Sequence, residues 1–177
     1  SKIIKKDDLV IIESTVPVGT TRRVSEMIFE KTGLSYEDVN YAYCPERVLP
    51  GNIINELLNN DRVIGGLTKK SLKKASELYS SFCRGKLIFT SSICAELVKL
   101  SENAFRDVNI AFANELSIIC EKLGVDVSEL ISIANHHPRV NILKPGCGVG
   151  GHCIAVDPWF LVSSFPEDSL LIKLARK

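Results

Sequence analysis

The chain has 177 residues, of which 45% are hydrophobic, and a formal net charge of +1 at pH 7. This length allows one large domain or parts of two, and the near-neutral charge argues against a nucleic-acid-binding protein. No apolar stretch is long enough to cross a bilayer, and the start of the chain has no signal-peptide core. We therefore expect a cytoplasmic protein without a membrane or nucleic-acid partner, whose six scattered cysteines are reduced.

The first part of the chain has the pattern of an α/β fold. The predicted elements, in chain order, are a strand at Leu9–Ile12, a helix from Thr20 or Thr21 through Glu30 with Gly33 closing it, a strand at Val39–Tyr43 and, after a loop, a strand at Arg62–Gly65. A strand as apolar as the first one suits a parallel sheet that is covered on both faces. Too few strands follow for an ordinary doubly wound sheet, so we predict a partial Rossmann-like parallel sheet.

Helical patterns dominate the rest of the chain. The predicted elements are an amphipathic helix at Lys69–Cys83 with Leu72, Ala75, Leu78, Tyr79 and Phe82 inward, an edge strand at Lys86–Thr90, a long helix at Ile93–Leu123 and a shorter helix at Ser128–Asn135. The long helix has no proline or glycine and would span roughly 45 Å. That is more than a small domain needs, so we expect it to lie between domains or subunits. We divide the chain into an α/β part at 1–92 and a mainly helical dimerisation domain at 93–177.

The segment Gly146–Pro158 is the most informative motif. Four of the six residues from 146 to 151 are glycine, so the backbone can approach a bound molecule closely. We predict that Cys153 lies where this loop enters a helix, a position that favours the thiolate. Asp157 would then lie one helical turn further on. We interpret Cys153 as a nucleophile and Asp157 as a group that orients water. The alternative is a glycine turn with a buried structural cysteine.

No metal site is predicted. Cys147, His152 and Cys153 are close in the sequence, but their spacing matches no usual tetrahedral zinc site, and there is no second ligand pair. The nucleophile interpretation is therefore favoured over metal binding.

Other candidate residues each have a structural alternative. Lys99 and Asn103 stand four apart on the long helix and share one face, where they could stabilise an oxyanion or form a solvated surface. Glu46 ends a strand at the edge where α/β sheets bind ligands, or it is an exposed loop carboxylate. Arg139 and Lys144 flank the glycine segment and could bind phosphate or be solvated.

Four ordered motifs extend over essentially the whole chain. They are Ser-Thr-Val-Pro-Val-Gly-Thr at 14–20, Cys-Pro-Glu-Arg-Val-Leu-Pro-Gly at 44–51, the stretch from Ala95 to Glu115 and Gly-Val-Gly-Gly-His-Cys-Ile-Ala-Val-Asp-Pro at 148–158. Together they resemble the UDP-glucose/GDP-mannose dehydrogenase family. Within that family, Pro-Glu-Arg at 45–47 and the run Asn135–Asn141 are most similar to the enzymes that oxidise UDP-N-acetyl-D-mannosamine.

The resemblance implies an NAD-dependent enzyme that oxidises the C6 alcohol of a UDP-sugar in two steps to a carboxylate, for surface polysaccharide synthesis. It implies that Cys153 forms a thiohemiacetal and then a thioester. Lys99 and Asn103 would stabilise the oxyanion, and Asp157 would position or activate water. The remaining implied contacts are Glu46 at the sugar and the nicotinamide, Thr15 at the cofactor, and Arg47, Arg139, Lys144 and Gly150 at the substrate, with Arg139 often supplied by a neighbouring subunit.

A symmetric homodimer is expected around the long helix. The predicted buried face includes Leu97, Leu100, Ala104 and Ala111. A non-catalytic module that only dimerises through this helix is the alternative from another functional class.

The chain also departs from the family pattern. The first strand is not followed by the Gly-x-Gly-x-x-Gly turn that holds the pyrophosphate of NAD in the family, and we expect the C-terminal UDP-sugar-binding domain to be missing. We therefore expect a fragment that is inactive by itself. Two enzyme alternatives remain: a 6-phosphogluconate or 3-hydroxyacid dehydrogenase relative, which shares the Lys-x-x-x-Asn helix but needs no cysteine, and a family member that acts on UDP-N-acetylglucosamine, UDP-N-acetylgalactosamine or UDP-glucose.

Overall fold

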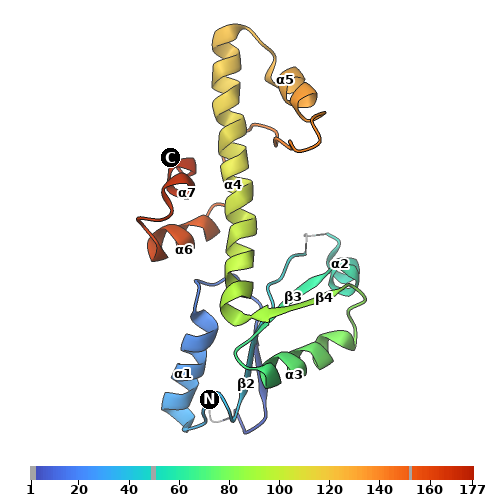
Figure 1. Ribbon diagram of the computed structural model, residues 1–177, viewed down its shortest axis with the longest axis vertical. Helices are drawn as coiled ribbons and strands as arrows, with labels where there is room; N and C mark the ends of the chain where they lie inside the picture. Colours follow the sequence, from blue (N-terminus) through green and yellow to red (C-terminus); the bar gives the residue numbers. More distant parts are fainter. Residues whose placement is uncertain (1–2, 49–50, 152) are drawn as a thin grey trace. The chain divides into compact units, whose positions relative to one another are not determined.

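Strand β1 (Leu9–Ile12) begins a four-stranded sheet with the order β1-β2-β3-β4 (Figure 1). The computed structural model describes residues 3–48, 51–151 and 153–177. The chain divides into two units, residues 1–99 and 100–177, and the boundary falls inside helix α4. The other elements of the first unit are α1 (Thr20–Thr32), β2 (Asn40–Tyr43), α2 (Ile53–Asn59), β3 (Arg62–Gly66), α3 (Lys69–Ser80) and β4 (Leu87–Ser91).

The sheet is mostly parallel, as predicted, but one strand pair differs. Strands β1 and β2 are parallel, β3 and β4 are parallel, and β2 and β3 are antiparallel, with Ala42 opposite Gly66. The connection from β2 to β3 joins neighbouring ends of the two strands, so it needs no crossover over a face of the sheet. Helix α2 forms within this connection, which we had predicted to be a loop.

The two faces of the sheet carry separate apolar clusters, because successive side chains of a strand point to opposite faces. One cluster joins the sheet to helix α3 and contains Ala42, Cys44, Ile64, Ala75 and Tyr79. The other joins it to the first turns of α4 and contains Tyr43, Val63 and Ala95. Both faces of β2 and β3 are therefore buried, whereas β1 is half-buried and much of β4 is exposed.

Helix α3 is shorter than predicted. It ends at Ser80, and its buried apolar residues are Ala75 and Tyr79. Leu78 and Phe82 were predicted to face inward, but they are 48% and 38% exposed. The reason for Phe82 is that it lies beyond the last helical residue, where the helical period no longer sets its direction.

A distant carboxylate caps helix α1. The N-cap residue is Gly19, not Thr20 or Thr21 as predicted, whereas Gly33 closes the helix in a left-handed conformation as predicted. The fully buried side chain of Glu96 accepts hydrogen bonds from the backbone of Gly19 (2.5 Å) and from the backbone and hydroxyl of Thr21 (2.7 and 2.6 Å). A carboxylate at this end satisfies free N–H groups and interacts favourably with the helix dipole.

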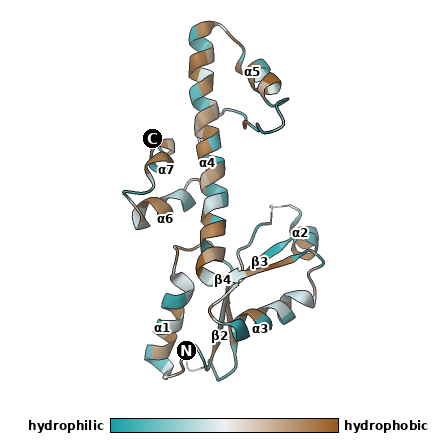
Figure 2. Cartoon of the chain, viewed as in Figure 1, coloured by the Kyte–Doolittle hydropathy of each residue, from teal (hydrophilic) through white to brown (hydrophobic). Residues whose placement is uncertain are grey.

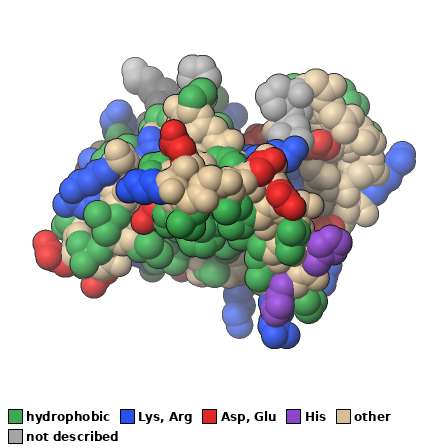
Figure 3. Space-filling model, turned by 90° about the horizontal axis from the view of Figure 1, so that it is seen from above, with side chains coloured by type: hydrophobic (Ala, Val, Ile, Leu, Met, Phe, Trp, Pro, Cys, Tyr) green, Lys and Arg blue, Asp and Glu red, His purple; other side chains and the backbone are tan. Residues whose placement is uncertain are grey.

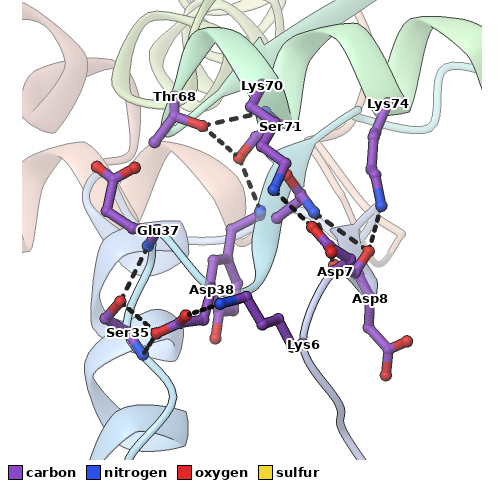
Figure 4. A network of polar contacts seen from close by, with 12 residues as sticks. Lys6, Asp7, Asp8, Ser35, Glu37, Asp38, Thr68, Lys70, Ser71 and Lys74 are labelled. Carbon is purple, nitrogen blue, oxygen red and sulfur yellow. Dashed lines mark hydrogen bonds and ion pairs between the residues drawn. The ribbon is translucent and has the colours of Figure 1, made fainter.

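A network of polar contacts links the segment before β1 to α3 and to the connection between α1 and β2 (Figure 4). Lys70 pairs with Asp7 at 2.5 Å, and Lys6 pairs with Asp38 at 3.3 Å. The hydrogen bond and charge of Lys70 lower the pKa of Asp7, and hydrogen bonds from Ser35 lower the pKa of Asp38. These groups are solvated, so each pair contributes little to stability.

The second unit is helical. It contains most of helix α4 (Ser92–Leu123) and also α5 (Val127–Ala134), α6 (Asp157–Ser164) and α7 (Leu170–Ala175). The long helix agrees with the predicted range to within one residue. Helix α5 is capped by Asp126, which accepts a hydrogen bond from the Ser128 N–H at 2.8 Å. None of the helices in the described part of the chain combines the length and apolar character that a membrane span requires.

Large apolar side chains remain exposed on this unit. Hydrophobic residues recur along the whole of α4 (Figure 2), and a space-filling view shows hydrophobic side chains across much of one face (Figure 3). The most exposed ones include Phe105, Phe112, Ile118, Leu123, Ile133, Leu171 and Leu174. In contrast, Leu100 and Ala104, which we had predicted for a dimer face, are buried within the chain.

Candidate active site

Cys153 lies in a turn that leads directly into helix α6. Its backbone carbonyl accepts hydrogen bonds from the N–H groups of Val156 (3.0 Å) and Asp157 (2.8 Å). The helix begins at Asp157, with Pro158 in its first turn. Cys153 therefore precedes the helix by one turn, and its side chain is exposed. This exposure argues against the alternative of a buried structural cysteine.

Asn103 and Asp157 form the buried polar contact next to this turn. The Asn103 Nδ2 atom donates to the Asp157 Oδ2 atom at 2.5 Å, and the two residues are 6% and 4% exposed. The bond joins helix α4 to the first residue of α6. The structure thus brings Asn103 and Asp157 together within the second unit. Lys99 lies four residues before Asn103 on the same face of α4 and is half-buried.

A second connection to the same turn comes from residues to which the sequence assigned no role. Asp107, which is fully buried, pairs with the Arg176 Nη1 atom at 2.7 Å. The Arg176 Nη2 atom also donates to the backbone carbonyl of Ala155 at 3.2 Å. The sequence feature that could have identified Asp107 is its spacing. It follows Asn103 by four residues and therefore lies on the same helical face.

Side-chain amides of α4 hold the segment before the glycine motif. Asn109 donates to the carbonyl of Asn141 (3.1 Å) and accepts from the N–H of Leu143 (3.0 Å). Asn114 accepts from the N–H of Gly146 at 2.8 Å. An amide that both donates and accepts can replace a neighbouring strand as the partner of an extended backbone. The loop is therefore ordered without a sheet.

Arg139, Lys144 and Gly150, predicted as substrate contacts, are all exposed on this part of the chain. Arg139 also lines a cavity of about 1090 Å³ within the second unit, together with Asn109 and Asn141. The wall is mainly apolar, with a few polar groups, as is usual for ligand sites and subunit interfaces.

In the first unit, Thr15 and Glu46 follow the neighbouring parallel strands β1 and β2. The loops lie side by side, because the Glu46 N–H donates to the carbonyl of Glu13 at 3.1 Å. The Glu46 carboxylate accepts from the backbone N–H of Arg47 (2.7 Å) and Val48 (3.0 Å), and both Thr15 and Glu46 are half-buried. This edge is where parallel sheets bind nucleotides, so these residues fit contacts to the nicotinamide side of NAD.

The N-terminus of helix α1 does not offer a phosphate site. Its first N–H groups are already hydrogen-bonded to Glu96. A pyrophosphate would therefore need N–H donors from another segment.

Arg62 supports Glu46 from the interior of the first unit. Its side chain lies 3.8 Å from the Glu46 carboxylate and over the ring of Tyr79, 5.1 Å from the ring centroid. The Tyr79 hydroxyl donates to the Glu13 carboxylate at 2.6 Å, and burial together with this bond raises the pKa of Tyr79. Burial likewise raises the pKa of the neighbouring Cys44 thiol. Cys44 is therefore a neutral thiol.

Among the residues that the structure describes, no three His, Cys, Asp or Glu side chains gather as a metal ion would require. Cys147 and Cys153 are both exposed, and His152, the third residue weighed for zinc, lies outside the described residues. Positions 49 and 50 of the second sequence motif also lie outside them.

Two domain models of one family match the chain. Residues 1–83 match the NAD binding domain of the UDP-glucose/GDP-mannose dehydrogenase family, and residues 94–177 match its central domain. The chain belongs to the UDP-glucose/GDP-mannose dehydrogenase family. The resemblance inferred from the four sequence motifs is therefore confirmed.

Relatives with different printed substrates are about equally similar. A UDP-N-acetyl-D-mannosamine dehydrogenase of Campylobacter jejuni is 55% identical over 100% of this chain and 46% of its own length. An NDP-N-acetyl-D-galactosaminuronic acid dehydrogenase of Ralstonia nicotianae is 56% identical over 99% of this chain and 43% of its own. A solved UDP-D-ManNAc dehydrogenase from Pyrococcus horikoshii is 48% identical, with a TM-score of 0.95 over 99% of this chain and 42% of its own. The chain thus spans less than half the length of these relatives.

Proposed function

We propose that this chain carries the catalytic turn and part of the cofactor site of an NAD-dependent UDP-sugar 6-dehydrogenase. The observation that carries the proposal is the exposed thiol of Cys153 on a turn that is joined to the buried Asn103–Asp157 contact. An exposed thiol precedes, by four residues, a carboxylate whose direction the Asn103 amide fixes. This is the set of groups that covalent oxidation of an aldehyde needs.

NAD, when bound, supplies the acceptor for the hydride in each of the two oxidations. Thr15 and Glu46 would hold its nicotinamide side at the edge of the sheet. The cofactor therefore belongs to the proposal on the basis of these residues and of the match to the family's NAD binding domain.

Cys153 would retain the substrate between the two oxidations. Its Sγ atom attacks the C6 aldehyde to give a thiohemiacetal, and after oxidation the same sulfur holds the acyl group as a thioester. Water then attacks the thioester carbon, the C–S bond breaks, and the thiol is regenerated with release of the carboxylate. From alcohol to acid, the substrate loses two hydride equivalents and gains one water oxygen.

Asp157 and Asn103 would act on the water and the oxyanion. Asp157 already accepts one hydrogen bond from Asn103, which fixes the direction of its carboxylate. The carboxylate can orient the attacking water, and the second N–H of the Asn103 amide, with the Lys99 ammonium, can stabilise the developing negative charge. Arg47, Arg139, Lys144 and Gly150 would contact the nucleotide sugar.

A UDP-N-acetylhexosamine is the proposed substrate class, with UDP-N-acetyl-D-mannosamine as the first candidate. The names of the similar proteins support it, because they refer to N-acetylmannosamine and N-acetylgalactosaminuronic acid. A panel of UDP-N-acetylhexosamines with the full-length protein would identify the epimer. A role in polysaccharide synthesis in the cytoplasm remains a prediction.

A homodimer built on α4 is part of the proposal. The exposed side chains of Phe105, Phe112 and Ile118 support it, because water rarely surrounds several large apolar residues of one helix. This face differs from the originally predicted one around Leu100 and Ala104. Light scattering that shows only monomer at high micromolar concentration would contradict it. A full-length protein that dimerises but has no enzyme activity would favour a non-catalytic module.

The decisive experiment compares Cys153→Ser with Cys147→Ser in the full-length protein. Serine ionises poorly, so the first variant should lose at least about a thousandfold of the acid-forming rate. The second changes an exposed cysteine six residues earlier and should retain activity. NAD reduction and acid formation are measured with quenched samples. A Cys153→Ser variant with near-normal rates would indicate a single-step dehydrogenase of the 6-phosphogluconate or 3-hydroxyacid type.

A further inference from the structure

Helix α4 contacts the Cys153 turn at two places along one face. Asn103 bonds to Asp157, where the turn ends, and one helical turn later Asp107 reaches the middle of the turn through Arg176 and the carbonyl of Ala155. The two contacts lie four residues apart on α4, which is the spacing of neighbours on a helical surface. The segment that presents the thiol is thus held at two points.

We infer that Asp107 and Arg176 are positioning residues, which clamp the Ala155 carbonyl and so fix the direction of the Cys153 thiol. Neither residue touches the reacting atoms. The inference rests on the proposed function for its catalytic consequence, whereas its structural part concerns the turn alone.

The burial of the pair supports this role. Asp107 is fully buried, and the Arg176 side chain is 14% exposed. A buried carboxylate needs a close partner, and a planar guanidinium can donate in two directions at once. Arg176 uses this property, since one terminal nitrogen binds Asp107 and the other binds Ala155. A lysine would retain the charge, but its single ammonium lacks the fork that reaches both oxygens.

The Ala155 carbonyl lies between the two groups on which the proposed chemistry depends. It is two residues after Cys153 and two residues before Asp157. The backbone of the turn also closes on itself, because the N–H groups of Val156 and Asp157 bond to the Cys153 carbonyl. A change in the position of Ala155 should therefore shift the backbone of the whole turn, from Cys153 to Asp157. Release of this carbonyl should widen the range of orientations of the thiol, while the Asn103–Asp157 bond continues to hold the start of α6.

The test uses Arg176→Lys and Arg176→Gln in the full-length protein, with Lys173→Gln as the control. Lys173 is on the same helix, one turn earlier, and is exposed. Hydrogen–deuterium exchange of the Val156 and Asp157 amides reports on the turn without any need for activity. We expect exchange of these two amides to be at least about tenfold faster than in the wild type in both Arg176 variants, and unchanged in the control. Exchange in α5 should be unchanged in all variants.

The kinetic readout separates positioning from a purely structural role. For Arg176→Lys, kcat should fall about 10- to 100-fold, while KM changes by less than about threefold, as expected when reacting groups lose alignment. Unchanged exchange in both Arg176 variants would overturn the clamp, and faster exchange with unchanged kcat would overturn its positioning role. If Arg176→Gln unfolds, Arg176→Lys decides. If the wild-type protein oxidises no UDP-sugar, the proposed function fails, but the exchange result still tests the clamp.

Discussion

The two units of this chain are stabilised in different ways. In the first unit, apolar side chains form clusters on both faces of a sheet, and tyrosine, isoleucine and alanine residues are fully buried. In the second unit, large apolar residues such as Phe105 and Leu174 remain exposed, and polar contacts to Asn103, Asp107 and Asn109 fix the loops. The first unit holds the two apolar clusters of its sheet, whereas specific hydrogen bonds hold the loops of the second unit. A mutation of the same chemical type should therefore have different effects in the two units.

A glycine-to-alanine pair gives the largest expected contrast in stability. At Gly65 of β3, an added Cβ atom would lie 2.6 Å from the Ser91 oxygen and 2.7 Å from the Ala95 Cβ atom. Gly65→Ala should lower the free energy of unfolding by about 3 kcal/mol or more, because the clash involves backbone atoms. Gly146 in the second unit has no atom within 4 Å of the added position. Gly146→Ala should be tolerated, and equal melting temperatures for both variants would contradict the comparison.

In the second unit, loss of a hydrogen bond should affect catalysis more than stability. Asn103→Ala removes the donor to Asp157. We expect kcat to fall on the order of a hundredfold, which corresponds to about 2.7 kcal/mol, because one preorganised donor is lost. KM should change less. Steady-state kinetics of the full-length protein provide the measurement, with Ser101→Ala, at an exposed position on the same helix, as the comparison. A variant that changes only KM would assign Asn103 to substrate binding.

Periodicity in the sequence was sufficient for several elements. Strand β1 and helix α4 were predicted within one residue, because an apolar run and an uninterrupted three- and four-residue period are local signals. The antiparallel pairing of β3 could not be predicted in this way, since strand direction depends on the path of the connection. The cap of α1 was wrong for a similar reason. Its carboxylate lies 75 residues away along the chain, and no pattern around Gly19 indicates it.

The cap of α1 is the third position at which the comparison can be tested. Glu96 accepts three hydrogen bonds in a fully buried place, so Glu96→Gln replaces an acceptor by an amide nitrogen. We expect a loss of about 2 kcal/mol in the free energy of unfolding, with faster amide exchange at the start of α1. The exposed Glu115→Gln on the same helix is the control. Equal urea midpoints for the two variants would contradict a stabilising role for the buried cap.

The smallest expected effect concerns acid pH. The pKa values of Asp7 and Asp38 are lowered in the folded chain. Their stabilising contribution is therefore complete above the unfolded pKa, near 3.8, and is lost as the pH falls through the folded pKa values. The double variant Asp7→Asn and Asp38→Asn should flatten the dependence of the melting temperature on pH below about 4, and added salt should reduce the difference further. Asp168→Asn in the second unit should leave this dependence unchanged.

The candidate site could be predicted only in part. The glycine motif, Cys153 and the four-residue spacing of Lys99 and Asn103 are visible in the sequence, and the structure joins Asn103 to Asp157. The roles of these residues remain predictions. Arg176 could not be found, because its partner Asp107 is 69 residues away and an arginine near a helix end is usually solvated. Asn109 and Asn114 were missed for the same reason, since an asparagine on a helix does not show which backbone it will bind.

The number of residues in helix α4 should also be constrained during the evolution of this chain. Asn103, Asp107, Asn109 and Asn114 each reach a different point of the segments beyond the helix. One inserted residue would turn everything after it by about 100° and advance it by about 1.5 Å. An insertion between Asn103 and Asp107 would thus place the contacts to the end and to the middle of the cysteine turn on different faces of the helix. Changes of length should accumulate in the surface loops, whereas α4 should keep its residue count through long divergence.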